Sequence, residues 1–170
     1  YVNQKKLFLK NNTKVDAKNI KNNLSSTRVL DAYIYNDKIF VSHTLNIDGC
    51  NTINISYAEL NYKKLNFEKL FSSSECVDIK NIDGEFNASQ SGGRIVFTDN
   101  NNFLLSTGDY RVRYLAQKKD SIFGKILKFN IKEKKHKIIS MGHRNPQGLL
   151  FDKKKRYFYQ LNTDQWEEMK

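Results

Sequence analysis

The residues best suited to chemistry lie in one short polar segment, residues 142–149, which reads GHRNPQGL. It combines a histidine, an arginine and two side-chain amides with the only proline of the chain. Apolar runs at residues 137–141 and 149–151 predict strands on both sides of it. Because a β scaffold commonly places its binding and catalytic groups on loops at strand ends, we expect this loop to belong to a functional site.

Short alternating segments separated by turns predict an all-β protein around this loop. Alternation is clearest in residues 51–60 (NTINISYAEL), where Ile53, Ile55 and Tyr57 alternate with polar or small residues. The strands that we predict are residues 28–35, 38–44, 51–60, 65–71, 93–97, 103–107, 125–131, 137–141, 148–151 and 156–161.

Repeated four-strand meanders are the sequence form of a β-propeller. We predict one domain over residues 1–170, a partial propeller of about three four-stranded antiparallel blades. The blades lie at residues 28–74, 93–141 and 146–164 onward, with strands of an earlier blade in residues 1–10. A β-sandwich is the competing architecture. Because closed propellers have about four to eight blades, we expect missing sequence, an unusual partial propeller or self-association.

The chain is strongly basic, with a net charge of +11 and a pI of about 9.6. Such a charge is compatible with a polyanion partner. The lysines are dispersed, however, and only residues 132–137 and 153–156 form clusters, both in predicted hairpin turns. We therefore expect solvated turns and no specific nucleic-acid partner. No apolar run approaches the ~20 residues that span a bilayer, and no signal peptide is recognisable at the start.

The cysteines and two of the histidines leave alternatives open. Cys50 and Cys76 flank the first predicted blade and are equally compatible with a disulfide in an oxidising compartment and with two buried thiols. His43 lies near a strand end and is expected to be structural, and His136 lies in a lysine-rich turn and is expected to be solvated. No cluster with metal-ligand spacing is visible, so we predict no metal-ligating residue.

Three stretches in register carry a resemblance to a known family. They are residues 91–97 (SGGRIVF) with 104–109 (LLSTGD), residues 123–129 (FGKILKF), and the loop at 142–149. Over residues 90–151 the chain resembles the soluble glucose/sorbosone (aldose sugar) dehydrogenases, which are six-bladed β-propellers that use pyrroloquinoline quinone (PQQ) and calcium. The resemblance implies a periplasmic or secreted quinoprotein oxidoreductase with a sugar or glycan ligand.

The resemblance also implies roles for two loop residues. Arg144 and Asn145 stand at positions that contact the cofactor in the family. PQQ carries three carboxylates, and arginine binds carboxylates through paired hydrogen bonds. In the family the adjacent histidine, here His143, is a structural residue of the loop.

The sequence departs from the family at the position of the catalytic base. Three residues before Gly93 the family has a histidine, which takes a proton from the sugar hydroxyl while hydride moves to the quinone; this chain has Gln90. A side-chain amide has no basicity near neutral pH, whereas imidazole titrates near pH 6.5. General-base catalysis contributes about 10²- to 10⁴-fold, so we expect an inactive site. The neighbouring Ser89 stands where many relatives have an acidic or polar residue.

A second departure affects the calcium site. The family continues to a Glu-His-Gly-Pro or Glu-Gln-Gly-Pro turn whose carbonyls help to bind calcium, and here residues 163–168 read TDQWEE. Trp166 replaces the glycine, which removes the residue that allows a close approach of the backbone.

Two functions remain open at this stage. The first is a PQQ-dependent oxidoreductase of aldose sugars that has lost its activity. The second is a non-catalytic propeller module that binds a glycan, an anion or a protein. The basic residues expected nearest to the site in either case are Arg94, Arg111, Arg113 and Arg144.

Overall fold

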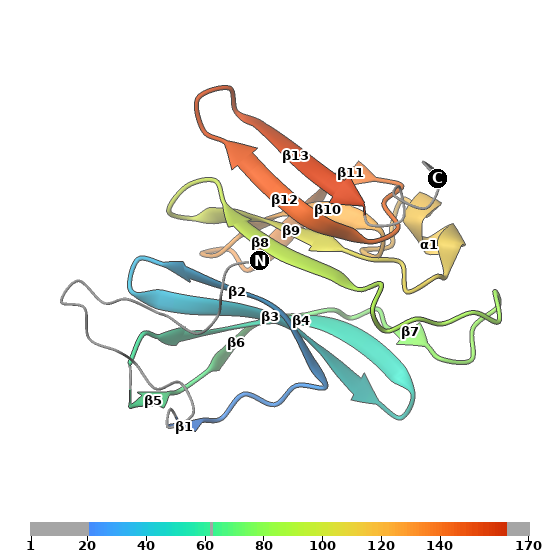
Figure 1. Ribbon diagram of the computed structural model, residues 1–170, viewed down its shortest axis with the longest axis horizontal. Coiled ribbons are helices and arrows are strands. Elements are labelled where there is room, and N and C mark those ends of the chain that lie inside the picture. The colour runs from blue at the N-terminus through green and yellow to red at the C-terminus, as the bar shows by residue number, and fades with distance from the viewer. Residues whose placement is uncertain (1–20, 62, 163–170) are drawn as a thin grey trace, which may run out of the picture.

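The computed structural model describes residues 21–61 and 63–162, which form antiparallel sheets in chain order (Figure 1). The first sheet has the order β2-β3-β4-β6, and β7 also pairs with β4. Its strands are β2 (Arg28–Tyr35), β3 (Lys38–Ile47), β4 (Cys50–Glu59), β6 (Glu68–Ser72) and β7 (Val77–Asp78).

The second sheet has four strands in the order β8-β9-β10-β11. They are β8 (Gly92–Phe97), β9 (Asn102–Thr107), β10 (Lys125–Asn130) and β11 (Lys135–Met141). A short helix, α1 (Arg113–Gln117), lies between β9 and β10. Two smaller sheets complete the described residues: antiparallel β12 (Pro146–Asp152) with β13 (Tyr157–Asn162), and parallel β1 (Lys21–Asn22) with β5 (Lys64–Leu65).

The larger sheets are stacked side by side in chain order (Figure 1). The first strand of the second sheet, β8, contacts the first strand of each neighbouring sheet, β2 and β12. First strands placed next to one another are the arrangement around a propeller axis. The expected all-β partial propeller is confirmed, with two strands of the third sheet among the described residues.

Asparagine and aspartate form the tight turns, as expected for a chain with few glycines. Asn36 and Asp37, with φ of 48° and 58°, connect β2 to β3, and Asp48 and Gly49, with φ of 52° and 88°, connect β3 to β4. Two-residue hairpins need positive φ because only then does the twist of the turn match that of the strands. Both turns fix the register of the first sheet.

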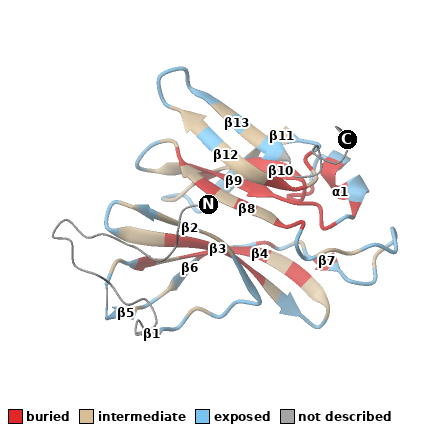
Figure 2. Ribbon diagram, in the orientation of Figure 1, coloured by how far each residue is buried: buried red, intermediate tan, exposed pale blue. Residues whose placement is uncertain are grey.

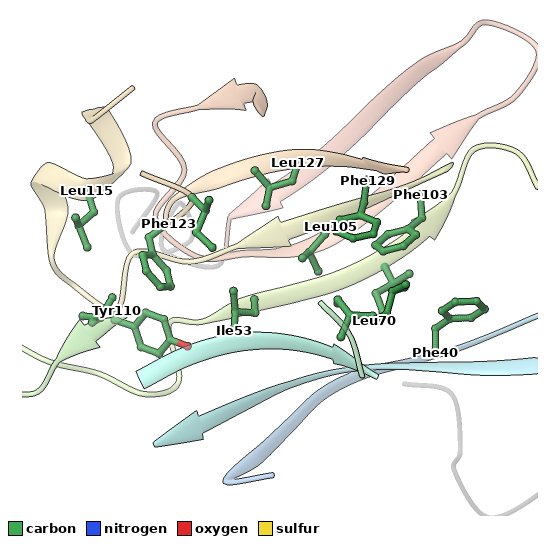
Figure 3. Packing of buried hydrophobic residues seen from close by; sticks show 14 of the residues in the cluster. Phe40, Ile53, Leu70, Phe103, Leu105, Tyr110, Leu115, Phe123, Leu127 and Phe129 are labelled. Atoms are coloured by element: carbon green, nitrogen blue, oxygen red, sulfur yellow. The ribbon is translucent and has the colours of Figure 1, made fainter. Parts of the chain in front are cut away.

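The main hydrophobic core lies between the first and second sheets (Figures 2 and 3). The Phe97 ring stacks on Tyr35 with centroids 4.1 Å apart and meets the edge of Phe40 at 4.9 Å. Further along the same layer, Phe103 stacks on Phe129 at 5.0 Å. The residues after Asn102 in β9 are all buried, because sheets pack on both faces of this strand. The second sheet therefore lies at the centre of the described structure.

A disulfide joins Cys50, at the start of β4, to Cys76, just before β7, with the Cα atoms 5.5 Å apart. The alternative of two buried thiols is therefore not what the structure contains. No described helix has the length and hydropathy needed to cross a membrane.

Several local features differ from the sequence predictions. The strand expected at 65–71 is divided into β5 and β6, and neither α1 nor β7 was predicted. His136 lies in β11 rather than in a turn, and its ring meets Phe71 at 5.3 Å. The strands expected in residues 1–10 and the segment 163–168, where the sequence departs from the family's calcium-binding turn, lie outside the described residues.

Candidate functional site

Three segments that are distant in sequence meet at one end of the sheets. The main-chain N–H of Asp109 donates to the Arg144 carbonyl at 2.8 Å, and that of Tyr110 donates to the Gln90 carbonyl at 3.0 Å. The Asn145 side-chain oxygen accepts from the Gly92 N–H at 3.2 Å. The structure therefore places the predicted site residues Gln90, Arg144 and Asn145 in one hydrogen-bonded group of loops.

Glycines permit this close approach. A Cβ atom on Gly108 would lie 2.0 Å from the Gln90 carbonyl oxygen, so any residue other than glycine would clash with the Gln90 backbone. Gly92 has a φ of +65°, a conformation that favours glycine. The carbonyl of Gly108 also accepts from the Gly124 N–H at 3.2 Å, and the carbonyl of Gly124 accepts from the His143 N–H at 3.0 Å. This ladder fixes the spacing between the second sheet and the polar loop.

Gln90 is almost completely buried, with 7% of its surface exposed. Its main chain is fully engaged, because the N–H donates to the Asn87 carbonyl at 3.0 Å and the carbonyl accepts from Tyr110. Its side-chain oxygen has no hydrogen-bond partner among the residues that the structure describes. Gln90 thus presents a buried amide oxygen that can accept a hydrogen bond but cannot take up a proton.

Asn145 is buried and Arg144 is half-buried. Pro146, the first residue of β12, accepts a bond from the buried Ser106 hydroxyl at 2.7 Å. The loop is therefore held at two points: Asp109 donates to the carbonyl of Arg144, and Ser106 donates to the carbonyl of Pro146. Such a loop can present an arginine without reorganising when a ligand binds.

Arg28, which the sequence analysis missed, belongs to the same site. Its guanidinium donates to the Ser89 hydroxyl at 3.1 Å, although the two residues are 61 positions apart. The Gln147 amide donates to the Ser89 carbonyl at 3.5 Å. The sequence around Arg28, at the start of β2, gives no indication of this contact, because only the stacking of β2 on β8 brings Arg28 to Ser89.

The other expected cations are held by carboxylates or are turned to the outside. Arg94 is 3.3 Å from Asp31 and donates to the Gln147 carbonyl at 2.5 Å. Arg113 forms an ion pair with Glu85 at 3.1 Å. Arg111 is exposed and has a φ of 72°. Arg144, which is half-buried in the loop, and Arg28, which contacts Ser89, are the arginines that belong to the same group of loops as Gln90.

The titratable side chains behind the site have structural contacts. The His143 ring nitrogen Nε2 is 2.8 Å from the Ser140 hydroxyl, and burial, with a smaller contribution from the charge of Lys125, lowers the pKa of His143. Lys125 is fully buried and donates to three carbonyls around α1, at 2.6, 2.9 and 2.8 Å. Burial raises the pKa of Tyr110 far above its usual range. His143 and Tyr110 are thus neutral at pH 7.

Stacked meanders that meet at a loop-built site define the chain as part of a β-propeller. A family model described as "Glucose / Sorbosone dehydrogenase" matches residues 10–163, and the chain belongs to this family. No curated protein sequence matches the chain.

Solved structures of this fold resemble the chain. A glucose dehydrogenase is 19% identical over 78% of this chain and 46% of its own, with a TM-score of 0.64. The apo form of the soluble aldose sugar dehydrogenase of Escherichia coli is 23% identical over 74% and 39%, with a TM-score of 0.59. The PQQ-bound aldose sugar dehydrogenase of Streptomyces coelicolor is 21% identical over 74% and 37%, with a TM-score of 0.55. The chain therefore spans less than half the length of each.

Proposed function

We propose that this chain forms the part of a quinoprotein sugar dehydrogenase-type propeller that binds an anionic cofactor and a sugar, and that it does not oxidise the sugar. The observation that carries the proposal is Gln90, a buried amide at the position of the family's proton acceptor. The main chain of Gln90 is held by Asn87 and Tyr110. A small shift of the loop therefore cannot bring a neighbouring basic side chain to the place of the Gln90 side chain.

The other titratable groups nearby are poor substitutes for the missing base. The His143 ring is buried and is bound to the Ser140 hydroxyl. The Asp109 carboxylate accepts a bond from the Arg111 N–H at 2.8 Å and is fully buried. Tyr110 is buried with a raised pKa. A general base must reach the proton that it removes and must titrate near the working pH. Tyr110 fails the second requirement, and the side chains of His143 and Asp109 are held in the contacts described above.

The residues present are suited to binding the quinone. Arg144 and Arg28 can each donate paired hydrogen bonds to a carboxylate, and PQQ carries three carboxylates. The Ser89 and Gln90 side chains offer polar contacts beside them. When bound, the quinone supplies the hydride acceptor of the reaction. Within this chain, Arg144 and Arg28 would hold its carboxylates, and Gln90 would accept a hydrogen bond from a sugar hydroxyl without removing its proton.

Calcium remains a prediction from the family. Among residues 21–61 and 63–162 there is no group of three or more acidic, histidine or cysteine side chains that could hold a metal ion. The turn that provides backbone carbonyls in the family corresponds to residues 163–168, which the structure does not describe. We propose no metal-ligating residue.

Binding should be measured separately from turnover. Titration of the protein with PQQ, followed by absorbance, is expected to show saturable binding that Arg144→Ala weakens about tenfold or more, the loss of a charge-assisted pair. Arg113→Ala, which removes an arginine engaged with Glu85, is the matched control and should bind as the wild type does. Equal affinity for PQQ in the wild type and Arg144→Ala would contradict the assignment of Arg144.

A binding module without redox chemistry is the second candidate. It is favoured by the same buried amide, together with the Arg28–Ser89 contact, because these groups can hold a glycan or an anion without a base. Binding of a glycan in the absence of PQQ, weakened by Arg144→Ala, would support this candidate. Binding only in the presence of PQQ would favour the first.

We propose a periplasmic or secreted location and a further sheet beside the third one. The location is supported by the Cys50–Cys76 disulfide, since such bonds persist in oxidising compartments. The further sheet, from missing blades or from self-association, is supported by the exposed apolar side chains of β12 and β13, which are Leu150, Tyr157, Tyr159 and Leu161. Exposed patches of this kind mark interaction surfaces.

A further inference from the structure

We propose that the chain has a second binding site, for a small neutral polyhydroxylated molecule such as a polyol or a monosaccharide, in a cavity on the first sheet. The cavity has a volume of about 190 Å³, and the residues lining it include His43, Leu45, Asn54, Ser56 and Phe67. None of these residues belongs to the loops around Gln90. The proposal therefore does not rest on the function proposed above.

The cavity lies on the face of the first sheet that points away from the second sheet. Neighbouring residues of a strand point to opposite faces. The Ser42 hydroxyl donates to the Gly93 carbonyl of the second sheet, so the next residue, His43, points the other way. His43 and Asn54 are directly opposite each other in the register of β3 and β4. Their side chains consequently stand next to each other on the wall of the cavity.

Two buried polar atoms of this wall make no hydrogen bond of normal geometry with residues 21–61 and 63–162. They are Nδ1 of His43 and Oδ1 of Asn54. The two residues are 3% and 1% exposed, respectively. The remaining polar atoms of both side chains are used: Nε2 of His43 is 2.9 Å from the Ser56 hydroxyl, and Nδ2 of Asn54 donates to the Thr52 hydroxyl at 3.0 Å. Because unpartnered buried polar atoms are rare and costly, this pair indicates a missing partner in the cavity.

The chemistry of the pair selects the ligand. Oδ1 of Asn54 is an acceptor only, so the ligand must donate a hydrogen bond to it. Burial lowers the pKa of His43, and a weak hydrogen-bond interaction with the Thr44 backbone opposes this shift to a smaller extent, so the ring is neutral at pH 7. A neutral ring nitrogen either donates or accepts, according to its tautomer. Hydroxyl groups satisfy both atoms, whereas a carboxylate or a phosphate offers no donor to Asn54.

The remaining lining suits the carbon skeleton of such a ligand. Phe67 and Leu45 provide apolar surface, and the exposed Lys69 is the cation among the lining residues. A single exposed lysine is a weak determinant for an anion, because water screens it. The cavity is smaller than the ~300 Å³ at which pockets for drug-sized ligands begin, which limits the ligand to about the size of one sugar ring.

The test is a titration of the full chain, with ¹⁵N-labelled histidine, observed by NMR. Glucose and glycerol are the probes, and inorganic phosphate is the charged comparison. We expect a saturable shift of the His43 Nδ1 resonance with a polyol and none with phosphate, while His136 on the second sheet stays unchanged. This wild-type measurement needs no variant. The absence of a saturable shift with either polyol, which would mean that only water fills the cavity, or an equal shift with phosphate would overturn the proposal.

A pair of variants tests the role of Asn54. Asn54→Leu removes the acceptor at similar volume and should raise the Kd for the polyol about two- to tenfold, the value of one neutral hydrogen bond. Asn100→Leu, at the exposed turn between β8 and β9, is the control and should leave the Kd unchanged. Circular dichroism establishes that both variants are folded. An unchanged Kd in folded Asn54→Leu would remove Asn54 from the site.

Discussion

The side-chain oxygen of Asn145 accepts a hydrogen bond from the main-chain N–H of Gly92 at 3.2 Å, across 53 residues of sequence. This bond joins the first residue of β8 to the loop before β12, so it links the second sheet to the third. Gly92 follows Gln90 by two positions in the sequence, so the bond also holds Asn145 beside the segment that contains Gln90. The inherited loop therefore has a structural role whether or not a cofactor binds.

Asn145→Ala should lower the free energy of unfolding by about 1–3 kcal/mol, because the Gly92 N–H loses its partner and a buried side chain is removed. Urea unfolding followed by circular dichroism measures this change. Asn66→Ala, at an exposed position between β5 and β6, is the control and should stay within about 0.5 kcal/mol of the wild type. Equal losses in both variants would show that the Asn145 bond does not contribute to stability.

Gly108→Ala should be among the most destabilising single-methyl changes in the chain. The added Cβ would lie 2.0 Å from the Gln90 carbonyl oxygen, so the backbone must move, at a cost of about 3 kcal/mol or more. Gly84→Ala is the comparison, since its Cβ would meet nothing within 4 Å and only its φ of +63° is unfavourable. We expect a cost of about 1 kcal/mol there. Thermal and urea unfolding of both variants would reveal the difference, and similar losses would contradict the close approach of the two loops.

Reduction of the Cys50–Cys76 disulfide should destabilise the chain by about 3–4 kcal/mol, as loop-closure entropy predicts for residues 26 positions apart. Urea unfolding with and without a reductant measures this loss. The double variant Cys50→Ala/Cys76→Ala should reproduce the stability of the reduced protein and should not respond to the reductant. A wild type whose unfolding is unaffected by the reductant would show that the bond is absent in solution.

The sequence predicted the strands of the second sheet well, because short apolar runs at residues 93–97, 103–107, 125–131 and 137–141 are separated by polar or irregular segments. It failed where tertiary contacts decide. α1 is only five residues long and has no side-chain cap. It is held by Lys125 of β10, whose ammonium group donates to the Leu115 carbonyl of the helix. The strand expected at 65–71 is divided because the Asn23 side chain bonds the Phe67 main chain, a contact across 44 residues.

The candidate site was predictable only in part. Gln90, Arg144 and Asn145 lie in or beside motifs with a recognisable spacing, so the sequence could single them out. Arg28 has no motif around it, and its contact with Ser89 depends on the stacking of two sheets. The unpartnered ring nitrogen of His43 is likewise invisible in a sequence, where the residue looks like an ordinary strand histidine.

Stability should fall as the pH decreases below about 6.5. Burial lowers the pKa of His43, His136 and His143 in the folded chain, so the unfolded chain binds more protons than the folded one between those lower values and 6.5. Stability is fully present above 6.5 and is lost on acidification toward the folded pKa values. Unfolding free energies at pH 7.5 and 5.5 measure the slope. His143→Gln, which retains a partner for Ser140, should show a shallower slope, and an unchanged slope would exclude His143 as a contributor.

The central claim is that Gln90 leaves the site without a base, and dye-linked oxidation of aldoses in the presence of PQQ and calcium tests it most directly. We predict background rates for the wild type and for the matched control Gln90→Asn. Gln90→His should raise the rate about 10²-fold or more, with a pH dependence governed by a group that titrates near 6.5. Wild-type turnover that Gln90→His does not exceed would contradict the claim, because the proton would then have to pass to a group other than residue 90.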